Sequence, residues 1–456
     1  MTPAVHGESG RESADTRGGL SLPAREYLAA AAQVLEGESP AETAKRMERL
    51  TWDHERWRSA HCLNLNAAEG LMSRGARRLL ASDFAARVTE GAPGDKIFPH
   101  PRQNRFIDEI EATLIGLTQK LFKVQHVEWR PVTTSMANAA VFVSLTRPGD
   151  TVLVQPEAAG GNYSYNIAGF PPLIGLKVAA LPYTGSCFEL DIERAADMVR
   201  RIRPRLIVIG GSNVLFPYPV RALRALADEV GALLLYDAAH VGLLIAANRF
   251  QLPLVEGAHL MTISTHKMMA GAVGGMVLSD DPEIIATISR RVFPHMLQTR
   301  DQNKYAATAY AFAEHLAFRD AYTRQIVANA RALGAALSDA GFDVFGRERG
   351  YSMTHQVFLR HPTIPAAEFE DRCQRADILA ARTLRTAGVL NGQPGGVIRV
   401  SVQEITRQGL TEPDMPRVAG LIAAAVNAMR PPEDVAETIA DWMSGLGPIR
   451  FSFDVA

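Results

Sequence analysis

The stretches ALLLYDAAHVGLLIA (residues 232–246) and HLMTISTHKMMAGAVGGMVL (residues 259–278) decide the fold of this chain. Each starts with a short, nearly continuous apolar run; Asp237 ends the first run and Lys267 follows the second. Apolar runs without polar alternation are typical of strands that helices cover on both faces. The two stretches therefore predict buried strands with polar side chains at their ends.

The same pattern recurs between about Asn104 and Asp280, where short apolar runs alternate with helical stretches. This alternation indicates an α/β domain built on a mostly parallel sheet. We predict strands at residues 151–155, 206–210, 232–237, 259–265 and 274–279, and helices at Gln103–Lys123, Ile192–Ile202 and Val220–Val230.

Both flanks of this region are predicted to be largely helical. Residues 22–57 form helices, with Ser39 as an N-cap before Pro40. They carry too few apolar side chains for a core of their own, so we expect them to pack on something else, such as a second subunit. After Gln302, alanine-rich helices lead to a smaller domain with strands at residues 355–360 and 396–402 and a closing helix at Asp414–Met429. The predicted plan is a disordered tail (1–20), a helical arm (21–85), a large domain (86–302), and a helical connector with a small C-terminal αβ domain (303–456).

Composition excludes several classes of protein. With 48 basic and 49 acidic residues among 456, the formal charge is −1, and no local basic patch predicts nucleic-acid or membrane binding. Three distant cysteines predict neither a disulfide framework nor a zinc knuckle, and no other metal site is expected. No apolar run reaches the roughly 20 residues of a membrane helix, and no secretion signal is present at the N-terminus. We expect a soluble, cytoplasmic protein.

Lys267 and Asp237 are the first candidates for chemistry, because ligands collect at strand ends in α/β sheets. A lysine there can form a Schiff base with a carbonyl cofactor, although a solvated lysine after a strand is the simpler interpretation. Asp237 suits the ring nitrogen of pyridoxal phosphate (PLP), but it can also cap a helix. His240, three residues on, suits the cofactor ring or its O3′ side. Together at this spacing, the residues favour a cofactor site.

A second group of residues suits a phosphate. Thr133, Thr134 and Ser135 precede an alanine-rich helix, whose N-terminal amides and hydroxyls form either a phosphate cradle or an ordinary cap. Gly274 and Gly275 allow another backbone to approach the phosphate, or they mark a simple turn.

Two charged residues suit a substrate. Arg399 lies in a strand-like apolar context, where a substrate carboxylate or a structural ion pair is needed to balance its charge. Glu69, after an apolar stretch, is either an acid/base group or a helix-start carboxylate.

These motifs resemble the serine hydroxymethyltransferase family, whose cofactor region has the pattern D-x-A-H, then T-T-H-K-T, then a G-P-R-G-G turn. The resemblance runs from about residue 60 to residue 430 and also covers NAAEGLMS, RVTEGAPGDKIF, PVTTSMANA, FPHMLQ, THQVFL and GVIRVSVQEITRQG. It implies the α/β fold of fold-type I PLP enzymes (aspartate-aminotransferase-like), with a mostly parallel seven-stranded sheet in the large domain. It also implies an obligate homodimer whose active sites are shared between subunits.

The resemblance assigns roles to individual residues. Lys267 matches the Schiff-base lysine, Asp237 the partner of the ring nitrogen, and Arg399 the clamp for the substrate carboxylate. Glu69 matches an active-site acid/base, and Glu90 the acidic residue near the hydroxymethyl group and the folate. The remaining implied cofactor contacts are Thr134, Ser135, Asn162, Asn213, His240, Ser264, His266 and Gly275.

The chain departs from the family where hydroxyls and stacking surfaces are used. Val88, Ala92 and Phe98 stand where the family has tyrosines, and Asn162 replaces the histidine that stacks on the cofactor ring, with Tyr163 beside it. The proline and arginine of the turn after the lysine have become Ala272 and Val273. WRP at 129–131, FPHMLQ and FSFD near the C-terminus look more like the threonine transaldolase branch of the same superfamily, which works without folate.

The sequence thus predicts a PLP enzyme that cleaves or forms the Cα–Cβ bond of a β-hydroxy-α-amino acid, leaving a glycine carbanion that the cofactor stabilises. Its small-molecule partners are this amino acid and an aldehyde or one-carbon acceptor, with folate-independent transaldolase or aldolase chemistry favoured. Alternatives are a tetrahydrofolate-dependent serine (or α-methylserine) hydroxymethyltransferase and another PLP reaction such as decarboxylation or racemisation. A non-catalytic PLP-binding scaffold would be expected to lack Lys267, Asp237 or Arg399, and all three are present.

Overall fold

The computed structural model describes residues 20–98, 100–184, 187–383 and 396–455. The chain divides into two compact units, one ending at Ala60 and the other beginning at His61. The disordered tail predicted for residues 1–20 lies outside the described residues, apart from Leu20. The other predicted domain boundaries stay predictions.

The first unit contains α1 (Leu22–Glu36) and α2 (Pro40–Ala60). The predicted N-cap is confirmed: Glu42 N donates to Ser39 Oγ at 3.3 Å, and Ser39 N donates back to the Glu42 carboxylate at 2.8 Å, which makes a capping box. No residue of either helix is buried within the described chain, as expected for helices without a core of their own.

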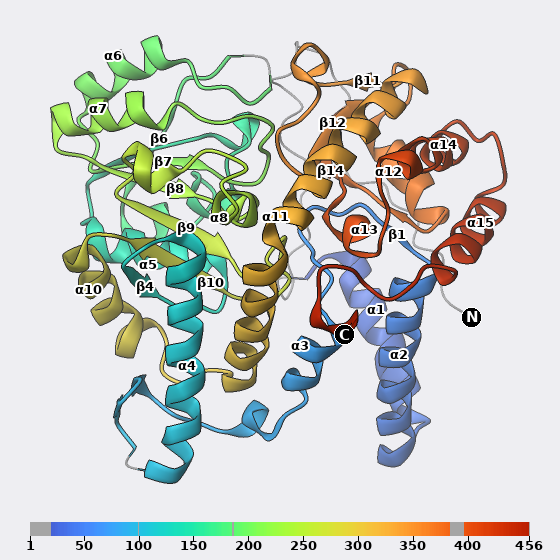
Figure 1. Cartoon of the computed structure of the whole chain (residues 1–456), viewed down its shortest axis with the longest axis horizontal. Helices are drawn as coiled ribbons and strands as arrows, with labels where there is room; N and C mark the ends of the chain where they lie inside the picture. The colour runs from blue at the N-terminus through green and yellow to red at the C-terminus, as the bar shows by residue number, and fades with distance from the viewer. Residues whose placement is uncertain (1–19, 99, 185–186, 384–395, 456) are drawn as a thin grey trace. The chain divides into compact units, whose positions relative to one another are not determined.

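A seven-stranded, mostly parallel sheet forms the centre of the second unit, which confirms the predicted fold (Figure 1). Strand β10 runs antiparallel to both β9 and β4, and the pairs β9–β8, β8–β7, β7–β5 and β5–β6 are parallel. In spatial order the strands are β4 (His126–Glu128), β10 (Gly275–Ser279), β9 (Leu260–Ser264), β8 (Leu233–Asp237), β7 (Leu206–Gly210), β5 (Thr151–Val154) and β6 (Lys177–Ala180).

Five of these strands match the sequence predictions, and the two edge strands were missed. Strand β6 lies at one edge and is only partly buried, so it lacks a continuous apolar run. Strand β4 at the other edge has three residues and ends in Glu128, a charged side chain that is nevertheless buried because Arg130 pairs with it.

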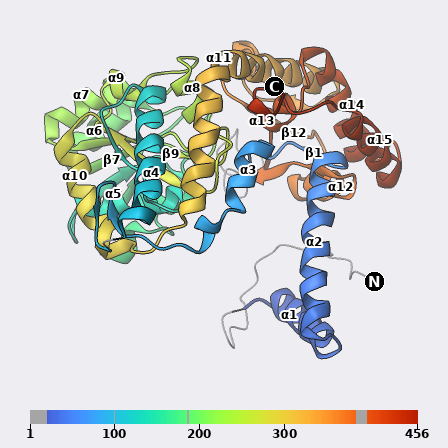
Figure 2. The same ribbon diagram turned by 60° about the horizontal axis from the view of Figure 1, so that its bottom comes forward.

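Helices cover the large sheet and connect it to a smaller one. They are α4 (Pro101–Phe122), α5 (Thr134–Leu145), α6 (Ile192–Ile202), α7 (Val220–Val230), α8 (Gly242–Ala246), α9 (Pro253–Glu256) and α10 (Pro282–Arg291). The alanine-rich region after Gln302 is one helix, α11 (Gln302–Asp339), where the sequence predicted several. Its N-terminal half lies beside α4, and its C-terminal half reaches the small sheet (Figures 1 and 2).

The small sheet is antiparallel, in the order β11–β12–β15–β14. Its register places Gln356 opposite Ser401 and Phe358 opposite Arg399. The predicted closing helix corresponds to α14, but it does not close the chain, because α15 follows it. The elements are β11 (Asp343–Val344), β12 (Gln356–Arg360), β14 (Ala381–Thr383), β15 (Val397–Ser401), α12 (Ala366–Arg375), α13 (Gln403–Arg407), α14 (Met415–Val426) and α15 (Pro432–Ser444).

The segment that follows α2 joins the small sheet before the chain enters the large one. Strand β1 (Leu63–Asn64) pairs in parallel with β13 (Ile378–Leu379), and Ser401 N donates to Leu65 O at 2.9 Å. Helix α3 (Arg74–Leu80) and the hairpin β2 (Gly91–Ala92) and β3 (Asp95–Lys96) come next.

The C-terminal end of the chain packs onto α3. Asp454 accepts the backbone amides of Arg74 and Gly75, the latter at 3.0 Å, and so caps the N-terminus of this helix. Among the described residues, no helix has both the length and the apolar composition that a bilayer crossing requires. The cytoplasmic location stays a prediction.

Candidate active site

Lys267 and Asp237 meet at one edge of the large sheet. Asp237 is the last residue of β8, and Lys267 lies three residues after the end of the parallel neighbour β9. Because the carboxyl ends of parallel strands share an edge, the two side chains come close enough for each charge to affect the pKa of the other. The prediction that Lys267 and Asp237 belong to one cofactor site is therefore consistent with the fold.

The Asp237 carboxylate is buried, with 1% of the residue exposed. It accepts Ala239 N at 2.9 Å and Asn138 Nδ2 at 3.1 Å, and both donors are neutral. Thr262 Oγ1 donates to Asn138 Oδ1 at 2.8 Å, which fixes the orientation of that amide. Burial raises the pKa of Asp237. Neither donor carries a positive charge, so a positively charged N–H would be a favourable additional partner for this carboxylate.

The Lys267 amine has no hydrogen-bond partner among the described residues and is half-buried. Its pKa is lowered from 10.5 to about 8, mainly by burial; Asp237 opposes this shift, and Arg399 adds to it. A measurable fraction of the amine is therefore neutral near physiological pH. Only the neutral amine is a nucleophile toward a carbonyl group.

His240 lies in the turn after β8 and is buried. Gln356 Nε2 approaches its Nδ1 at 3.1 Å, and the ring stacks on His355 with centroids 5.8 Å apart and planes 14° apart. Burial, followed by the charge of Lys267, holds the pKa of His240 well below its usual value. The imidazole is consequently neutral.

The N-terminus of α5 offers backbone amides to an anion. Thr133 Oγ1 accepts Met136 N at 3.1 Å, and the amides of Thr134 and Ser135 precede the first intrahelical bond. Ser135 is exposed, whereas the Thr134 hydroxyl is buried and donates to Ile263 O at 3.4 Å. A Cβ at Gly275 would lie 2.5 Å from Thr133 O, so the glycine lets β10 support this loop from behind.

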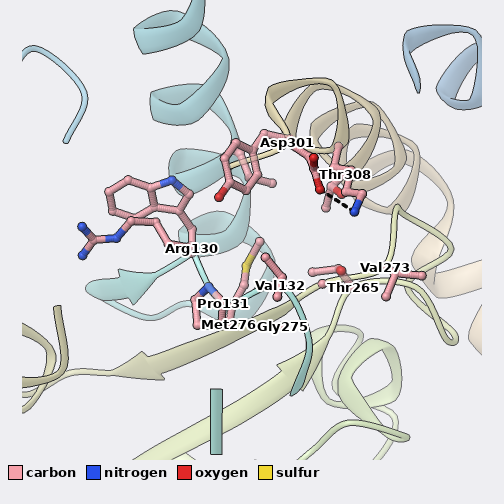
Figure 3. A pocket seen from close by; sticks show the side chains of 14 residues that line it. Arg130, Pro131, Val132, Thr265, Val273, Gly275, Met276, Asp301 and Thr308 are labelled. Carbon is pink, nitrogen blue, oxygen red and sulfur yellow. Dashed lines mark ion pairs between the residues drawn. The ribbon is translucent and has the colours of Figure 1, made fainter. Parts of the chain in front are cut away.

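A hollow behind the loop is shown in Figure 3. Val132, Thr265, Val273 and Gly275 line one side of it, and the start of α11 lines the other, where Asp301, the residue before the helix, pairs with Lys304 at 2.6 Å. The cavity measures about 20 Å³, which accommodates about one water molecule. This cavity is too small for an amino acid, so it is not the substrate site, and the candidate site is the cluster around Lys267.

Arg399 points from β15 toward the same cluster. Its Nη1 donates to Ser212 O at 2.9 Å and to Asn213 Oδ1 at 3.1 Å, and both acceptors are uncharged. Within the described chain no carboxylate forms an ion pair with it. Burial lowers its pKa to about 10, so it stays charged at neutral pH. A half-buried cation without a carboxylate partner among the described residues fits the carboxylate of a ligand.

Glu69 reaches the site from the β1 segment. Asn66 Nδ2 and Asn64 Nδ2 donate to its carboxylate at 2.9 and 3.2 Å. The next residue, Gly70, packs so closely that a Cβ there would lie 1.9 Å from Lys267 O. The structure therefore places Glu69 beside the lysine loop of the same chain.

Several predicted cofactor contacts are engaged with other protein groups. Ser264 Oγ pairs with His266 Nδ1 at 3.0 Å, and burial lowers the pKa of His266 to about 4. Asn162 Nδ2 donates to Ser212 Oγ at 2.8 Å, and Asn162 Oδ1 accepts Ser164 N. These contacts give the residues supporting positions around the site.

Glu90 does not join this cluster. It precedes β2, in the hairpin that Lys96 ties to α4 through Asp108 and the buried Glu111. Its assignment to the active site stays a prediction.

The cluster fits PLP. A partly neutral lysine, a buried carboxylate bonded to neutral donors, and a helix N-terminus backed by a glycine match the aldehyde, the ring nitrogen and the phosphate of this cofactor. Sequence reasoning missed Asn138, His355 and Gln356. Asn138 was visible as a polar residue within an alanine-rich helix, and His355 and Gln356 lie in the THQVFL motif of the family resemblance, which assigned them no role.

Comparisons with known proteins agree with this geometry. The family model of serine hydroxymethyltransferase matches residues 42–422. The chain is 35% identical over 418 residues to the serine hydroxymethyltransferase of Pyrococcus abyssi, covering 88% of this chain and 95% of the relative. It is 35% identical to that of Methanosphaera stadtmanae, over 91% of this chain and 97% of the relative. Among solved structures, it resembles an L-threonine transaldolase from Pseudomonas fluorescens with a TM-score of 0.83 at 26% identity, over 93% and 96% of the two chains.

Proposed function

Since this chain belongs to the serine hydroxymethyltransferase family and is a PLP-dependent transferase of that family, we propose that it cleaves and forms the Cα–Cβ bond of a β-hydroxy-α-amino acid without folate, with an aldehyde as acceptor. The observation that carries the proposal is Arg399, a half-buried cation bonded to neutral oxygens at the edge where Lys267 and Asp237 meet. It suits a substrate with a free carboxylate.

Five residues would hold the cofactor. When bound, PLP supplies a ring that accepts the electron pair of a broken bond to the substrate Cα. Lys267 would bind its aldehyde carbon, and Asp237 would keep the ring nitrogen protonated. The amides of Thr134 and Ser135 would bind the phosphate at the start of α5, and His240 would donate a hydrogen bond to the ring oxygen.

Arg399 and Glu69 would act on the substrate. Arg399 would bind the α-carboxylate with the guanidinium nitrogen Nη2, since Nη1 is the nitrogen engaged with Ser212 and Asn213. Glu69, held by two asparagine amides beside the Lys267 loop, would accept the proton of the substrate β-hydroxyl. General base assistance of this kind contributes about 10²–10⁴ in rate.

Apolar side chains on the Glu90 hairpin support folate independence. Val88 and Phe98 are 45% and 42% exposed, and they stand where the resembling family has tyrosine hydroxyls. The solved L-threonine transaldolase that resembles this fold supports the same choice. The tyrosine hydroxyls that folate-linked transfer uses are thus missing from the surface around Glu90.

The test is product formation from threonine or serine, with and without tetrahydrofolate and with an acceptor aldehyde such as benzaldehyde. We expect threonine and the aldehyde to give a new β-hydroxy-α-amino acid without folate. Lys267→Ala is the control: it should abolish both this product and the cofactor absorbance near 420 nm.

A tetrahydrofolate-dependent serine hydroxymethyltransferase is the second candidate, favoured by the 35% identity to proteins of that name. Strict dependence of serine cleavage on folate, with no product from threonine, would establish it in place of our proposal. Stable PLP binding without turnover of any donor would instead indicate a non-catalytic scaffold.

We propose further that the enzyme is a homodimer in which Glu90 completes the site of the other copy. The support is the position of Glu90 outside its own cluster and the exposed helices α1 and α2. In mixed dimers of Lys267→Ala and Glu90→Gln subunits, a shared site leaves one intact site per dimer. Activity should therefore return on mixing; two inactive parents that stay inactive in a verified mixed dimer would contradict the arrangement.

A further inference from the structure

Gln356 is fully buried at the start of β12, between the small sheet and the cofactor edge of the large sheet. Its side-chain amide makes three hydrogen bonds. Val214 N donates to Oε1 at 2.8 Å, and Nε2 donates to Ser212 O at 2.9 Å and lies 3.1 Å from His240 Nδ1. No other described side chain bonds His240 and the 212–214 turn at the same time.

The two backbone contacts fix the orientation of this amide. A backbone N–H can only donate and a backbone carbonyl can only accept, so Oε1 must face Val214 N and Nε2 must face Ser212 O. Nε2 therefore presents its second hydrogen to His240 Nδ1. The ring nitrogen that receives it must be bare, and the imidazole carries its single proton on Nε2.

The surroundings of His240 support a neutral ring. Lys267 and His266 face it from the loop after β9, Arg399 from β15, and His355 from the residue before β12; each of them disfavours a second proton on the ring. Asp237, in the same turn, is engaged with Ala239 and Asn138. His355 also stacks on the ring and limits its rotation.

The Ser212 carbonyl links this arrangement to substrate binding. It accepts Gln356 Nε2 at 2.9 Å and Arg399 Nη1 at 2.9 Å. Asn213 Oδ1 accepts the same Arg399 nitrogen, and Ser212 Oγ accepts Asn162 Nδ2. Displacement of this turn would therefore move Arg399 and loosen the support of Asn162.

We propose that Gln356 is a positioning residue that holds His240 as a neutral Nε2–H donor and anchors the Ser212–Asn213 turn on which Arg399 docks. This inference deepens the proposed function, because what His240 donates to and what Arg399 binds come from that function. The absence of a proton on His240 Nδ1 follows from contacts within the chain alone.

The first test reads that ring directly. Nitrogen NMR of the holoenzyme labelled in histidine, with the His240 resonance assigned by its absence in His240→Asn, should show a bare Nδ1 and a protonated Nε2. In Gln356→Glu the side chain accepts a hydrogen bond from His240 Nδ1–H instead of donating one to Nδ1, so Nδ1 should become protonated. A protonated Nδ1 in the unaltered enzyme, or an unchanged His240 resonance in Gln356→Glu, would overturn the proposal.

The second test separates positioning from general packing. Gln356→Met keeps the volume but none of the three bonds, and should lower kcat/KM about 10²-fold by displacing Arg399 and His240. Gln356→Glu should add an ionisation to the pH profile of kcat that disappears in the Gln356→Glu/His240→Asn double variant. If both single variants keep the original pH profile and kcat/KM, Gln356 has no positioning role. Absence of aldol activity in the unaltered enzyme would contradict the proposed function and leave the NMR result standing.

Discussion

Arg399 and Arg407 lie eight positions apart, on β15 and α13, and meet opposite environments. Arg407 is fully buried and pairs with Glu314 at 2.5 Å, while its Nη1 donates to Leu71 O at 2.7 Å. Arg399 donates only to a carbonyl and an amide oxygen within the described chain. A structural arginine forms an ion pair with a carboxylate of the protein. An arginine that binds a ligand has no such pair, so its charge is available for the carboxylate of the ligand. The following predictions test this difference.

Arg407→Met should give the largest effect. It leaves the buried Glu314 carboxylate without its cation and should lower the free energy of unfolding by about 3–5 kcal/mol. The measurement is the urea midpoint with PLP in excess. Arg399→Met is the matched control, and it should leave the midpoint unchanged or higher because no carboxylate is stranded. Equal losses in the two variants would remove the distinction.

Arg399→Met should instead affect ligand binding. Loss of a charged hydrogen bond to the substrate carboxylate, worth about 1.5–3 kcal/mol, should weaken amino-acid binding about 10- to 100-fold. Titration of the cofactor absorbance with glycine measures this binding. The glycine affinity of Arg399→Lys should lie between those of the unaltered enzyme and Arg399→Met, since an ammonium group keeps the charge but not the planar, bidentate geometry of the guanidinium. Unchanged glycine affinity in Arg399→Met would show that the clamp lies elsewhere.

One buried histidine accompanies each arginine, and both should make the protein sensitive to acid. Burial, helped by Arg399 and Arg407, lowers the pKa of His355 and of His315 to about 3, while the unfolded chain titrates near 6.5. Below pH 6.5 the unfolded state therefore binds more protons, and stability falls as pH falls. At pH 5 each histidine should cost about 2 kcal/mol.

Unfolding free energies at pH 7 and pH 5 measure this loss. His315→Gln and His355→Gln should each reduce the difference between the two pH values by about 2 kcal/mol. A difference as large as in the unaltered protein would mean that the histidine is already protonated in the folded state.

The smallest effect is expected for Arg407→Met combined with Glu314→Met. Removing both charges strands neither, so the double variant should recover most of the stability that Arg407→Met loses. Denaturant unfolding of the two single variants and the double variant gives the coupling energy. Additive losses would show that the pair does not act as a unit.

The fold was largely predictable because its central strands are buried on both faces. The continuous apolar runs at β7, β8 and β9 clearly predicted buried strands. Asp237 and Lys267 were recognisable as polar residues at or just after the ends of β8 and β9. Edge strands such as β6 have one solvent-exposed side and lack that pattern. Residue spacing alone did not show whether Arg399 binds a substrate carboxylate or forms a structural ion pair.

The supporting contacts were not predictable in the same way. Gln356 and His240 are 116 positions apart, and Glu314 and Arg407 are 93 apart, so their contacts depend on how distant strands and helices pack together. A polar residue in a strand gives no indication of whether its partner is a backbone turn, a histidine or water. Such contacts become visible only when the tertiary structure is known.

The cap that Asp454 places on α3 has a consequence for how a newly made molecule folds. Gly75 and Asp454 are 379 positions apart, which a ribosome spans in roughly 20–75 s at 5–20 residues per second. During that time the N-terminus of α3 is capped by the Ser73 hydroxyl alone, without the Asp454 carboxylate, and the β1 segment that carries Glu69 waits for Ile378 and Leu379. The packing of α3 and β1 is therefore completed only late in biosynthesis.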